Sequence, residues 1–256
     1  MKVGSLDIEF TNREVTAWGG LSLLKQLLDR SGILPFMTTL PLPRQGSNRG
    51  YAPLQLLVHF WVAIWCGASR FEHLDQIRHD HDLTTMLGWK QGAGHKAITR
   101  YLKKFTLGSN HAVFPALYRW IFQQVRFDNF TLDLDSTVLT RYGEQQGAAK
   151  GYNPTKRGRK SHHPLMAFVA ECRMVANFWL RSGNTGAASN VYAFLTETLA
   201  LREGKVIGLL RADSGFHDRK IFEWLENRER PISYIIAMRF QPPVQRMLAH
   251  HSAWIR

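Results

Sequence analysis

Apolar residues in the first half of the chain recur at the spacing of amphipathic helices. One such pattern covers residues 16–30 and stops at Ser31-Gly32, where glycine favours the end of a helix. A second begins at Pro53, a residue suited to a first helical turn, and continues to Cys66. Further helical patterns follow at residues 69–79, 82–88, 94–107 and 111–126.

Two stretches of this half depart from the helical pattern. Residues 1–15 read as an extended lead-in, and residues 35–50 contain three prolines and are predicted to form a loop. The longest apolar stretch, residues 54–68, includes Gln55 and His59 and is too short to cross a bilayer, so we expect a buried helix and no membrane association.

From residue 127 onward the pattern changes to short apolar runs bounded by turn signals, as is typical of strands. The predicted strands cover residues 130–139, 164–171, 175–181, 206–211 and 232–239, and the predicted helices cover residues 187–202 and 219–227. An antiparallel meander followed by crossover helices is the order of the ribonuclease H-like fold. We therefore predict an α+β protein, with an all-helical region over residues 1–126 and a ribonuclease H-like mixed sheet with helices over residues 127–256.

The net charge gives information about the binding partner of the protein. Lys and Arg number 33 against 20 acidic residues, which leaves a net charge of +13. Such an excess favours a polyanionic partner, although a merely basic soluble protein is the simpler alternative. The two cysteines, Cys66 and Cys172, form no Cys-x-x-Cys pair and no disulfide framework, so a structural zinc site is not expected and a cytoplasmic location is.

Three aspartates stand on or beside the predicted strands. Asp133 and Asp135 are two residues apart and share one face of their strand, and Asp213 follows the strand over 206–211. Because the first and fourth strands of this fold are neighbours, Asp133 or Asp135 is expected close to Asp213. A carboxylate in an apolar strand is costly unless it is paired, protonated or bound to a cation, so the three predict a magnesium site. For Asp213 alone, a turn or helix cap is the simpler role.

A basic segment follows the acidic strand, from Lys150 to Pro164. It holds five cations, two histidines, an aromatic residue and no acid, and its glycines would let a phosphate approach the backbone. We predict DNA contacts here, with a solvated surface hairpin as the alternative, from Lys150, Tyr152, Lys156, Arg157, Arg159 and Lys160.

A second basic feature lies on the predicted helix over residues 94–107. Its apolar face is accompanied by four cations, as on a DNA-contacting helix that follows a turn. An ordinary amphipathic surface helix with solvated cations explains the pattern equally well. The candidate DNA contacts are Lys96, Arg100, Lys103 and Lys104.

Residues 128–240 resemble the DDE transposases of bacterial insertion sequences, and in particular the branch called transposase DDE domain group 1. Six motifs carry the resemblance in the same order: Leu132-Asp-Leu-Asp-Ser-Thr137, Tyr142-Gly143, Gly147-Ala-Ala-Lys-Gly-Tyr-Asn-Pro154, His163-Pro-Leu165, Arg181-Ser-Gly-Asn-Thr-Gly186 and Arg211-Ala-Asp-Ser-Gly-Phe216.

The resemblance implies an enzyme that cuts and joins double-stranded DNA at the terminal inverted repeats of a transposon, with two Mg²⁺ or Mn²⁺ ions. It places the first catalytic aspartate in the Asp133–Thr137 motif, where the Asp-Gly-Thr of related families favours Asp135 over Asp133, and the second at Asp213. Transposases of this kind pair DNA ends as oligomers, so a homo-oligomer is expected.

The family's third carboxylate is a glutamate on a helix well downstream. The chain stops at Arg256, and Glu223, Glu226 and Glu229 stand too soon after Asp213 to replace that glutamate. We therefore expect a ribonuclease H-like domain that is incomplete at the C-terminus, in a truncated transposase.

Two other functions remain as alternatives. A non-catalytic DNA-binding remnant of a transposase fits the missing glutamate. Asp133-Leu-Asp-Ser-Thr137 also fits the Asp-x-Asp-x-Thr motif of haloacid dehalogenase-like phosphatases, with Asp133 as nucleophile and Asp135 as general acid/base.

Overall fold

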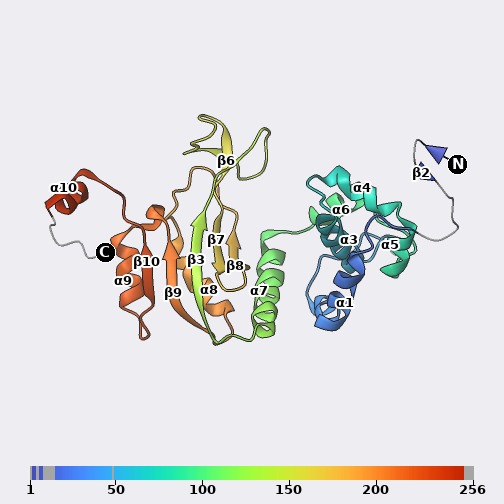
Figure 1. The fold of residues 1–256 in the computed structure, drawn as a ribbon, viewed down its shortest axis with the longest axis horizontal. Coiled ribbons are helices and arrows are strands. Elements are labelled where there is room, and N and C mark those ends of the chain that lie inside the picture. Colours follow the sequence, from blue (N-terminus) through green and yellow to red (C-terminus); the bar gives the residue numbers. More distant parts are fainter. Residues whose placement is uncertain (1, 4–5, 8–14, 48, 251–256) are drawn as a thin grey trace. The chain divides into compact units, whose positions relative to one another are not determined.

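The structure is a computed structural model of the 256-residue chain and describes residues 2–3, 6–7, 15–47 and 49–250. It divides into two compact units, Met1–Leu117 and Tyr118–Arg256, each of which is described by itself. The division falls inside helix α7 (Leu107–Gln124), which ends just before the boundary expected after residue 126 (Figure 1).

The first unit is built from helices. Besides the start of α7, it contains a 3₁₀ turn (Phe71–His73), a pair of two-residue antiparallel strands, β1 (Lys2–Val3) and β2 (Leu6–Asp7), and helices α1 (Leu21–Ser31), α2 (Ile33–Thr39), α3 (Pro53–Trp65), α4 (Leu74–Arg78), α5 (His81–Met86) and α6 (His95–Leu102). The predicted start of α3 at Pro53 is confirmed. The apolar faces of these helices meet in one core that includes Val62, Ile77 and Ile98.

The prediction of a loop over residues 35–50 is wrong for residues 35–39, which belong to helix α2. Gly32 takes a left-handed conformation, with φ of 75°, and α2 begins directly after it. Pro35 lies in the first turn of α2, where a backbone N–H has no helical acceptor, so a proline there costs the helix nothing.

The second unit contains a mixed five-stranded sheet. Its strands are β3 (Asn129–Ser136), β7 (Leu165–Val169), β8 (Met174–Trp179), β9 (Val206–Ala212) and β10 (Ser233–Ile236), in the spatial order β10-β9-β3-β7-β8. The pairs β3–β7 and β7–β8 are antiparallel, and the pairs β3–β9 and β9–β10 are parallel. This is the predicted ribonuclease H-like order, so the α+β fold class is confirmed.

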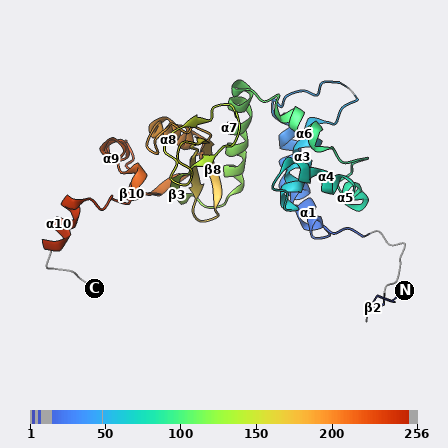
Figure 2. The same cartoon turned by 90° about the horizontal axis from the view of Figure 1, so that it is seen from above.

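Helices α8 (Val191–Leu201) and α9 (Arg219–Glu226) lie on one side of this sheet (Figure 2). Phe194, Ile221 and Phe122 of α7 pack with Leu132 in a core in which each is at most 1% exposed. Because strand side chains alternate, Asp133 and Asp135 lie on the opposite face of β3 from Leu132 and Leu134.

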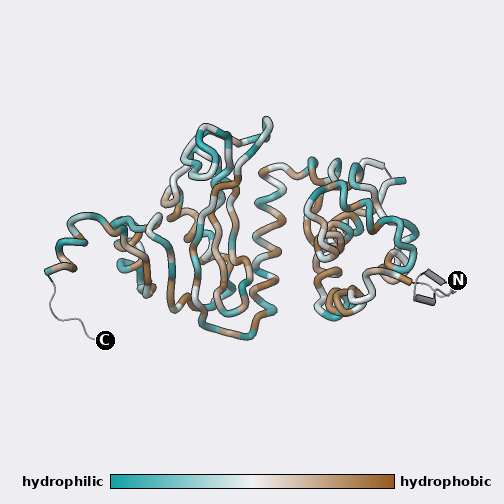
Figure 3. Tube along the Cα trace, turned by 45° about the horizontal axis from the view of Figure 1, so that its top comes forward, coloured by the Kyte–Doolittle hydropathy of each residue, from teal (hydrophilic) through white to brown (hydrophobic). Residues whose placement is uncertain are grey.

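A smaller three-stranded sheet is inserted between β3 and β7. It consists of β4 (Leu139–Thr140), β5 (Ala149–Lys150) and β6 (Lys160–His162), in the order β4-β6-β5. The tube in Figure 3 is largely teal or white in this insertion and browner along the central strands. A short 3₁₀ turn, η2 (Ser214–Phe216), follows β9.

Helix α10 (Pro242–His250) was not predicted. None of the residues 242–250 is buried, so no strong apolar face marked this helix in the sequence. Among the described residues, every helix falls short of the length and apolar character that a membrane span requires.

Candidate metal and nucleic-acid site

The topology brings Asp135 and Asp213 to the same edge of the central sheet. Leu134 of β3 is in register with Ala212 of β9, and each aspartate is the next residue of its strand or loop. The two strands are parallel neighbours, about 4.8 Å apart, and both reach this edge with their carboxyl ends. Both aspartates are exposed. This edge is where open sheets of parallel strands usually bind ligands.

Each of these two carboxylates keeps one oxygen available. Oδ1 of Asp135 accepts a hydrogen bond from the backbone N–H of Ser136 at 2.7 Å, and Oδ1 of Asp213 accepts one from Gly215 at 2.9 Å. The second bond caps η2, so the capping role considered for Asp213 is present as well. Neither Oδ2 atom has a hydrogen bond or ion pair within the described residues. Two exposed carboxylates with available oxygens suit a hard divalent cation such as Mg²⁺ or Mn²⁺.

Asp133 is in a different situation from Asp135. The guanidinium of Arg211, its register partner on β9, donates from Nε to Oδ1 at 2.6 Å and from Nη2 to Oδ2 at 2.7 Å. These hydrogen bonds raise the pKa of Arg211. The partner of Asp133 thus comes from a strand that is 78 residues away in the sequence. Since both oxygens of Asp133 are engaged, Asp135 is the better placed metal ligand.

No third ligand accompanies the two aspartates in the part of the chain that the structure describes. Within residues 15–47 and 49–250, no group of three His, Cys, Asp or Glu side chains is arranged to hold a metal. On α9, Glu223 accepts a hydrogen bond from Arg219 and Glu226 accepts one from the hydroxyl of Tyr234, so both are engaged elsewhere.

His162 and His163 have structural roles beside this edge. The ring of His163 lies within 3.2 Å of the Ser136 hydroxyl through Nε2 and within 2.6 Å of the Thr185 carbonyl through Nδ1. The ring of His162 accepts from Arg141 Nε and donates to the Gln146 carbonyl, both at 2.9 Å. Both imidazoles are buried, and they tie the end of β3 and the insertion to neighbouring loops.

The insertion carries the six predicted DNA contacts, and five of the six are exposed: Lys150, Tyr152, Lys156, Arg157 and Arg159. Lys160 is half-buried and pairs with Glu144. Arg157 lies between two hollows of about 350 Å³ and 400 Å³, and the first of these is also lined by Arg141 and Tyr142.

Arg141 and Tyr142 were not among the predicted contacts. Tyr142 is 73% exposed, and the Arg159 guanidinium lies 5.8 Å from the centre of its ring. Arg141 stands before the basic run, in a loop without a pattern of its own, so the sequence offered no signal beyond the Tyr142-Gly143 motif. Surfaces that bind nucleic acid commonly combine exposed aromatic rings with basic side chains.

Two glycines join the insertion to the loop after β8. A β-carbon at Gly151 would stand 1.9 Å from the carbonyl oxygen of Gly183, and one at Gly183 would stand 2.3 Å from that of Ser161. Neither position therefore has room for a side chain. We expected the glycines of this segment to let a phosphate approach the backbone. At Gly151 the absent side chain instead lets the backbone of the loop after β8 come close.

Arg181 stabilises the same loop from inside. Arg181 as a residue is 7% exposed, and its guanidinium donates to the carbonyls of His163, Ala187 and Ser189. Burial lowers the pKa of Arg181, so these carbonyls are what make a buried cation tolerable here. The Arg181–Gly186 motif is thus explained as an anchor for the loop that leads into α8.

In the first unit, α6 is shorter than predicted, because the helix expected over residues 94–107 ends at Leu102. Ile98 and Tyr101 are buried, whereas the four predicted contacts are exposed: Lys96, Arg100, Lys103 and Lys104. Gly94, which precedes α6, has no side chain to cap the helix. Asp75 takes this role, because its Oδ1 accepts a hydrogen bond from the backbone N–H of His95 at 2.8 Å. Lys104 donates to the carbonyl of Arg44 at 2.9 Å, and Nε of Arg100 donates to the carbonyl of Lys96 at 3.3 Å.

Comparisons with known proteins give one family and several structures. A family model described as transposase DDE domain group 1 matches residues 2–256. No curated protein sequence matches the chain.

Two solved structures are similar to the chain. One is a piggyBac transposase synaptic complex with hairpin DNA, at 13% identity and a TM-score of 0.47, over 91% of this chain and 54% of that one. The other is a Drosophila P element transposase strand transfer complex, at 10% identity and a TM-score of 0.38, over 84% of this chain and 47% of that one. The chain spans about half the length of these proteins.

Proposed function

Because the chain belongs to the transposase DDE domain group 1 family, we propose that it binds double-stranded DNA at the terminal inverted repeats of a transposon and takes part in metal-dependent cutting and joining of phosphodiester bonds. The observation that carries this proposal is the placement of Asp135 and Asp213 at adjacent ends of β3 and β9. Both carboxylates are exposed, and a basic insertion begins directly after β3.

In this proposal Asp135 and Asp213 hold Mg²⁺ or Mn²⁺. Such ions, two in the complete family site, activate the attacking oxygen and stabilise the leaving oxygen in phosphodiester chemistry. The Asp133–Arg211 pair links β3 to β9 two register steps before these carboxylates, and it engages both oxygens of Asp133, so Asp133 is not part of the proposed metal site.

The insertion supplies the contacts to the DNA backbone. Its cations stand at the same edge of the sheet as Asp135, because β4 begins three residues after Ser136 ends β3. Attraction between these cations and phosphates would bring the duplex to the carboxylates. A second DNA contact is assigned to the exposed cations Lys96 and Arg100 of α6 and to Lys103 and Lys104 directly after it.

A third carboxylate is needed for the complete family site. The described residues place none beside Asp135 and Asp213. We therefore expect this chain to bind metal and DNA, and to require for strand cleavage a third carboxylate that its described residues do not place at this site. A second copy of the chain is one source, which agrees with the expected homo-oligomer.

Calorimetric titration with Mn²⁺ tests the metal site. The Asp135→Asn, Asp213→Asn double variant should weaken binding at least tenfold, because both available carboxylate oxygens are lost. Asp133→Asn is the matched control, since it removes one charge two residues away from Asp135 on the same strand face, and it should change the affinity by less than threefold. Unchanged affinity in the double variant would overturn the assignment.

The Asp133→Asn variant also distinguishes the proposed function from the phosphatase alternative. A phosphatase of the haloacid dehalogenase kind needs an unengaged carboxylate at Asp133, and the bidentate bond from Arg211 occupies both of its oxygens. We expect no turnover of p-nitrophenyl phosphate. Turnover that Asp133→Asn abolishes would establish the phosphatase instead.

A further inference from the structure

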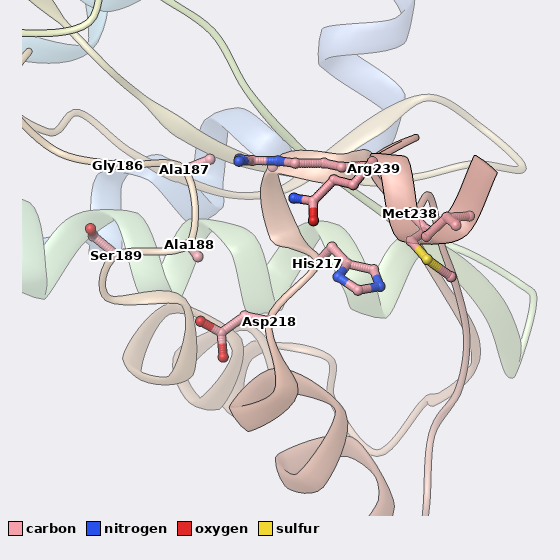
Figure 4. Close-up of a pocket in the computed structure, with 11 residues that line it drawn as sticks. Gly186, Ala187, Ala188, Ser189, His217, Asp218, Met238 and Arg239 are labelled. Carbon is pink, nitrogen blue, oxygen red and sulfur yellow. The ribbon is translucent and has the colours of Figure 1, made fainter. Parts of the chain in front are cut away.

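A cavity of about 430 Å³ lies beside Asp213 and has no role in the function proposed so far. The loop before α8, the turn after β9 and the segment that joins β10 to α10 form its walls. Figure 4 shows the Arg239 side chain extended toward the Gly186–Ala187 loop, with His217 and Asp218 beneath it. Its volume is within the range of about 300–1,000 Å³ that is usual for small-molecule sites.

One wall of the cavity is shared with the metal site. Gly215 lines the cavity, and its backbone N–H donates to Oδ1 of Asp213 at 2.9 Å. A β-carbon at Gly215 would stand 3.0 Å from both Asp213 Oδ1 and the β-carbon of Ala187, so the wall is closely packed there. A ligand in the cavity would therefore lie next to the carboxylate that we assign to the metal.

The cavity offers polar groups without partners. The guanidinium of Arg239 makes no hydrogen bond or ion pair within the described part of the chain, and the ring nitrogens of His217 make none there either. The His217 ring is held edge-on against Phe222, with 5.1 Å between the ring centres. An unpaired guanidinium is suited to a phosphate, which it can bind through two parallel hydrogen bonds.

An acidic group opposes Arg239 in the lining of the cavity. Oδ1 of Asp218 accepts from the backbone N–H of Lys220 at 2.8 Å, and its Oδ2 has no partner among the described residues. A cavity lined by both signs of charge is poorly suited to a bare anion. It suits a ligand that carries a phosphate at one end and hydrogen-bond donors at the other, such as the amino group of a base. Gly186, Ala187 and Ala188 line one wall of the cavity with a glycine and two small apolar side chains, a surface on which a flat ring can pack.

From these features we propose that the cavity is a subsite for one nucleotide of the DNA strand that is processed at Asp213. Arg239 binds its phosphate, and Asp218 accepts a hydrogen bond from its base. The proposal rests on the proposed function, because it assigns to the substrate of that function a place beside the metal ligands. It predicts that a single nucleotide binds without any metal.

The test is a titration of the full isotope-labelled chain with deoxycytidine 5′-monophosphate in EDTA, followed by amide NMR. The amide signals of Gly186 and Gly215 should shift with saturation. Arg239→Ala should weaken binding at least tenfold, and Ser189→Phe, at an exposed position of the cavity rim, should block it. Arg246→Ala is the matched control, because this exposed arginine on α10 lies outside the cavity and its loss should change the affinity by less than twofold.

Two results would overturn the subsite. One is the absence of shifts at Gly186 and Gly215 in the wild-type chain at 10 mM nucleotide. The other is an equal response to inorganic phosphate, which would reduce the cavity to a general anion site. Because EDTA removes divalent ions, neither result bears on the Mn²⁺ titration, so a failure of the subsite is distinguishable from a failure of the proposed function.

Discussion

Substituting Gly183 by alanine should detach the basic insertion from the loop after β8. The added β-carbon would stand 2.3 Å from the carbonyl oxygen of Ser161 on β6 and 2.5 Å from that of Ala149 on β5. These two residues are register partners, so the clash is with a paired backbone that has no flexible end. An ordinary carbon–oxygen contact is about 3.3 Å, so each distance must grow by about 1 Å.

The magnitude follows from this geometry. An extra methyl group in a packed site costs about 1–3 kcal/mol, and we expect the upper end, about 3 kcal/mol, because two backbone strands must move. The insertion should bear most of this loss, since it can move away from the loop while the central sheet stays folded. Exchange of the Arg141 amide hydrogen, which is bonded to the Lys160 carbonyl, should then become about 100 times faster.

Amide hydrogen exchange measured by NMR provides the assay, with Gly158→Ala as control. Gly158 has φ of +76°, and a β-carbon added there would have no neighbour within 4 Å, so alanine costs about 1 kcal/mol of backbone strain and causes no clash. DNA affinity should fall more in Gly183→Ala than in the control. Equal exchange rates in the two variants would show that the glycine contact does not hold the insertion.

Three further predictions concern charge and burial. Burial raises the pKa of the Cys66 thiol to about 11, so at pH 8 a thiol reagent should modify the exposed Cys172 at least about 100 times faster than Cys66. Desolvation lowers the pKa of His59, so on acidification the unfolded chain binds a proton at this residue before the native chain does. The free energy of unfolding should therefore fall as the pH drops below about 6.5. In urea unfolding at pH 7 and at pH 5.5, His59→Gln should reduce the difference between the two free energies. Removing Lys150 and Arg157 together should reduce the slope of log affinity for duplex DNA against log salt by about 1.8, if each contacts one phosphate. An unchanged slope would place both side chains away from the DNA.

The order of the strands in the central sheet was predictable from the sequence, and so was the position of the strand with Asp133 and Asp135 beside the strand that leads to Asp213. Both depend on strand succession, which alternating apolar runs reveal. The pairing of Asp133 with Arg211 was not predictable, because it depends on register between strands that are far apart in sequence.

Short and irregular features were missed for a different reason. Strands of two or three residues, such as β5, are too short to show an alternation of apolar and polar residues. Helix α2 was missed because Pro35 and the prolines after it indicated a loop. The close approach of Gly151 to Gly183 is a contact between backbones, which no side-chain pattern records.

The connection between β3 and β7 affects the order in which this domain folds. Residues 137–164 separate the two strands, and closing such a loop costs about 2 kcal/mol more than closing a two-residue turn. The hairpin of β7 and β8 therefore forms more easily than the pair β3–β7, although β3 leaves the ribosome first. The parallel partner of β3 is β9, which ends at Ala212, so Asp135 and Asp213 come together late. In a chain still under synthesis, the metal site that we propose at these two carboxylates consequently cannot form until Asp213 has been added.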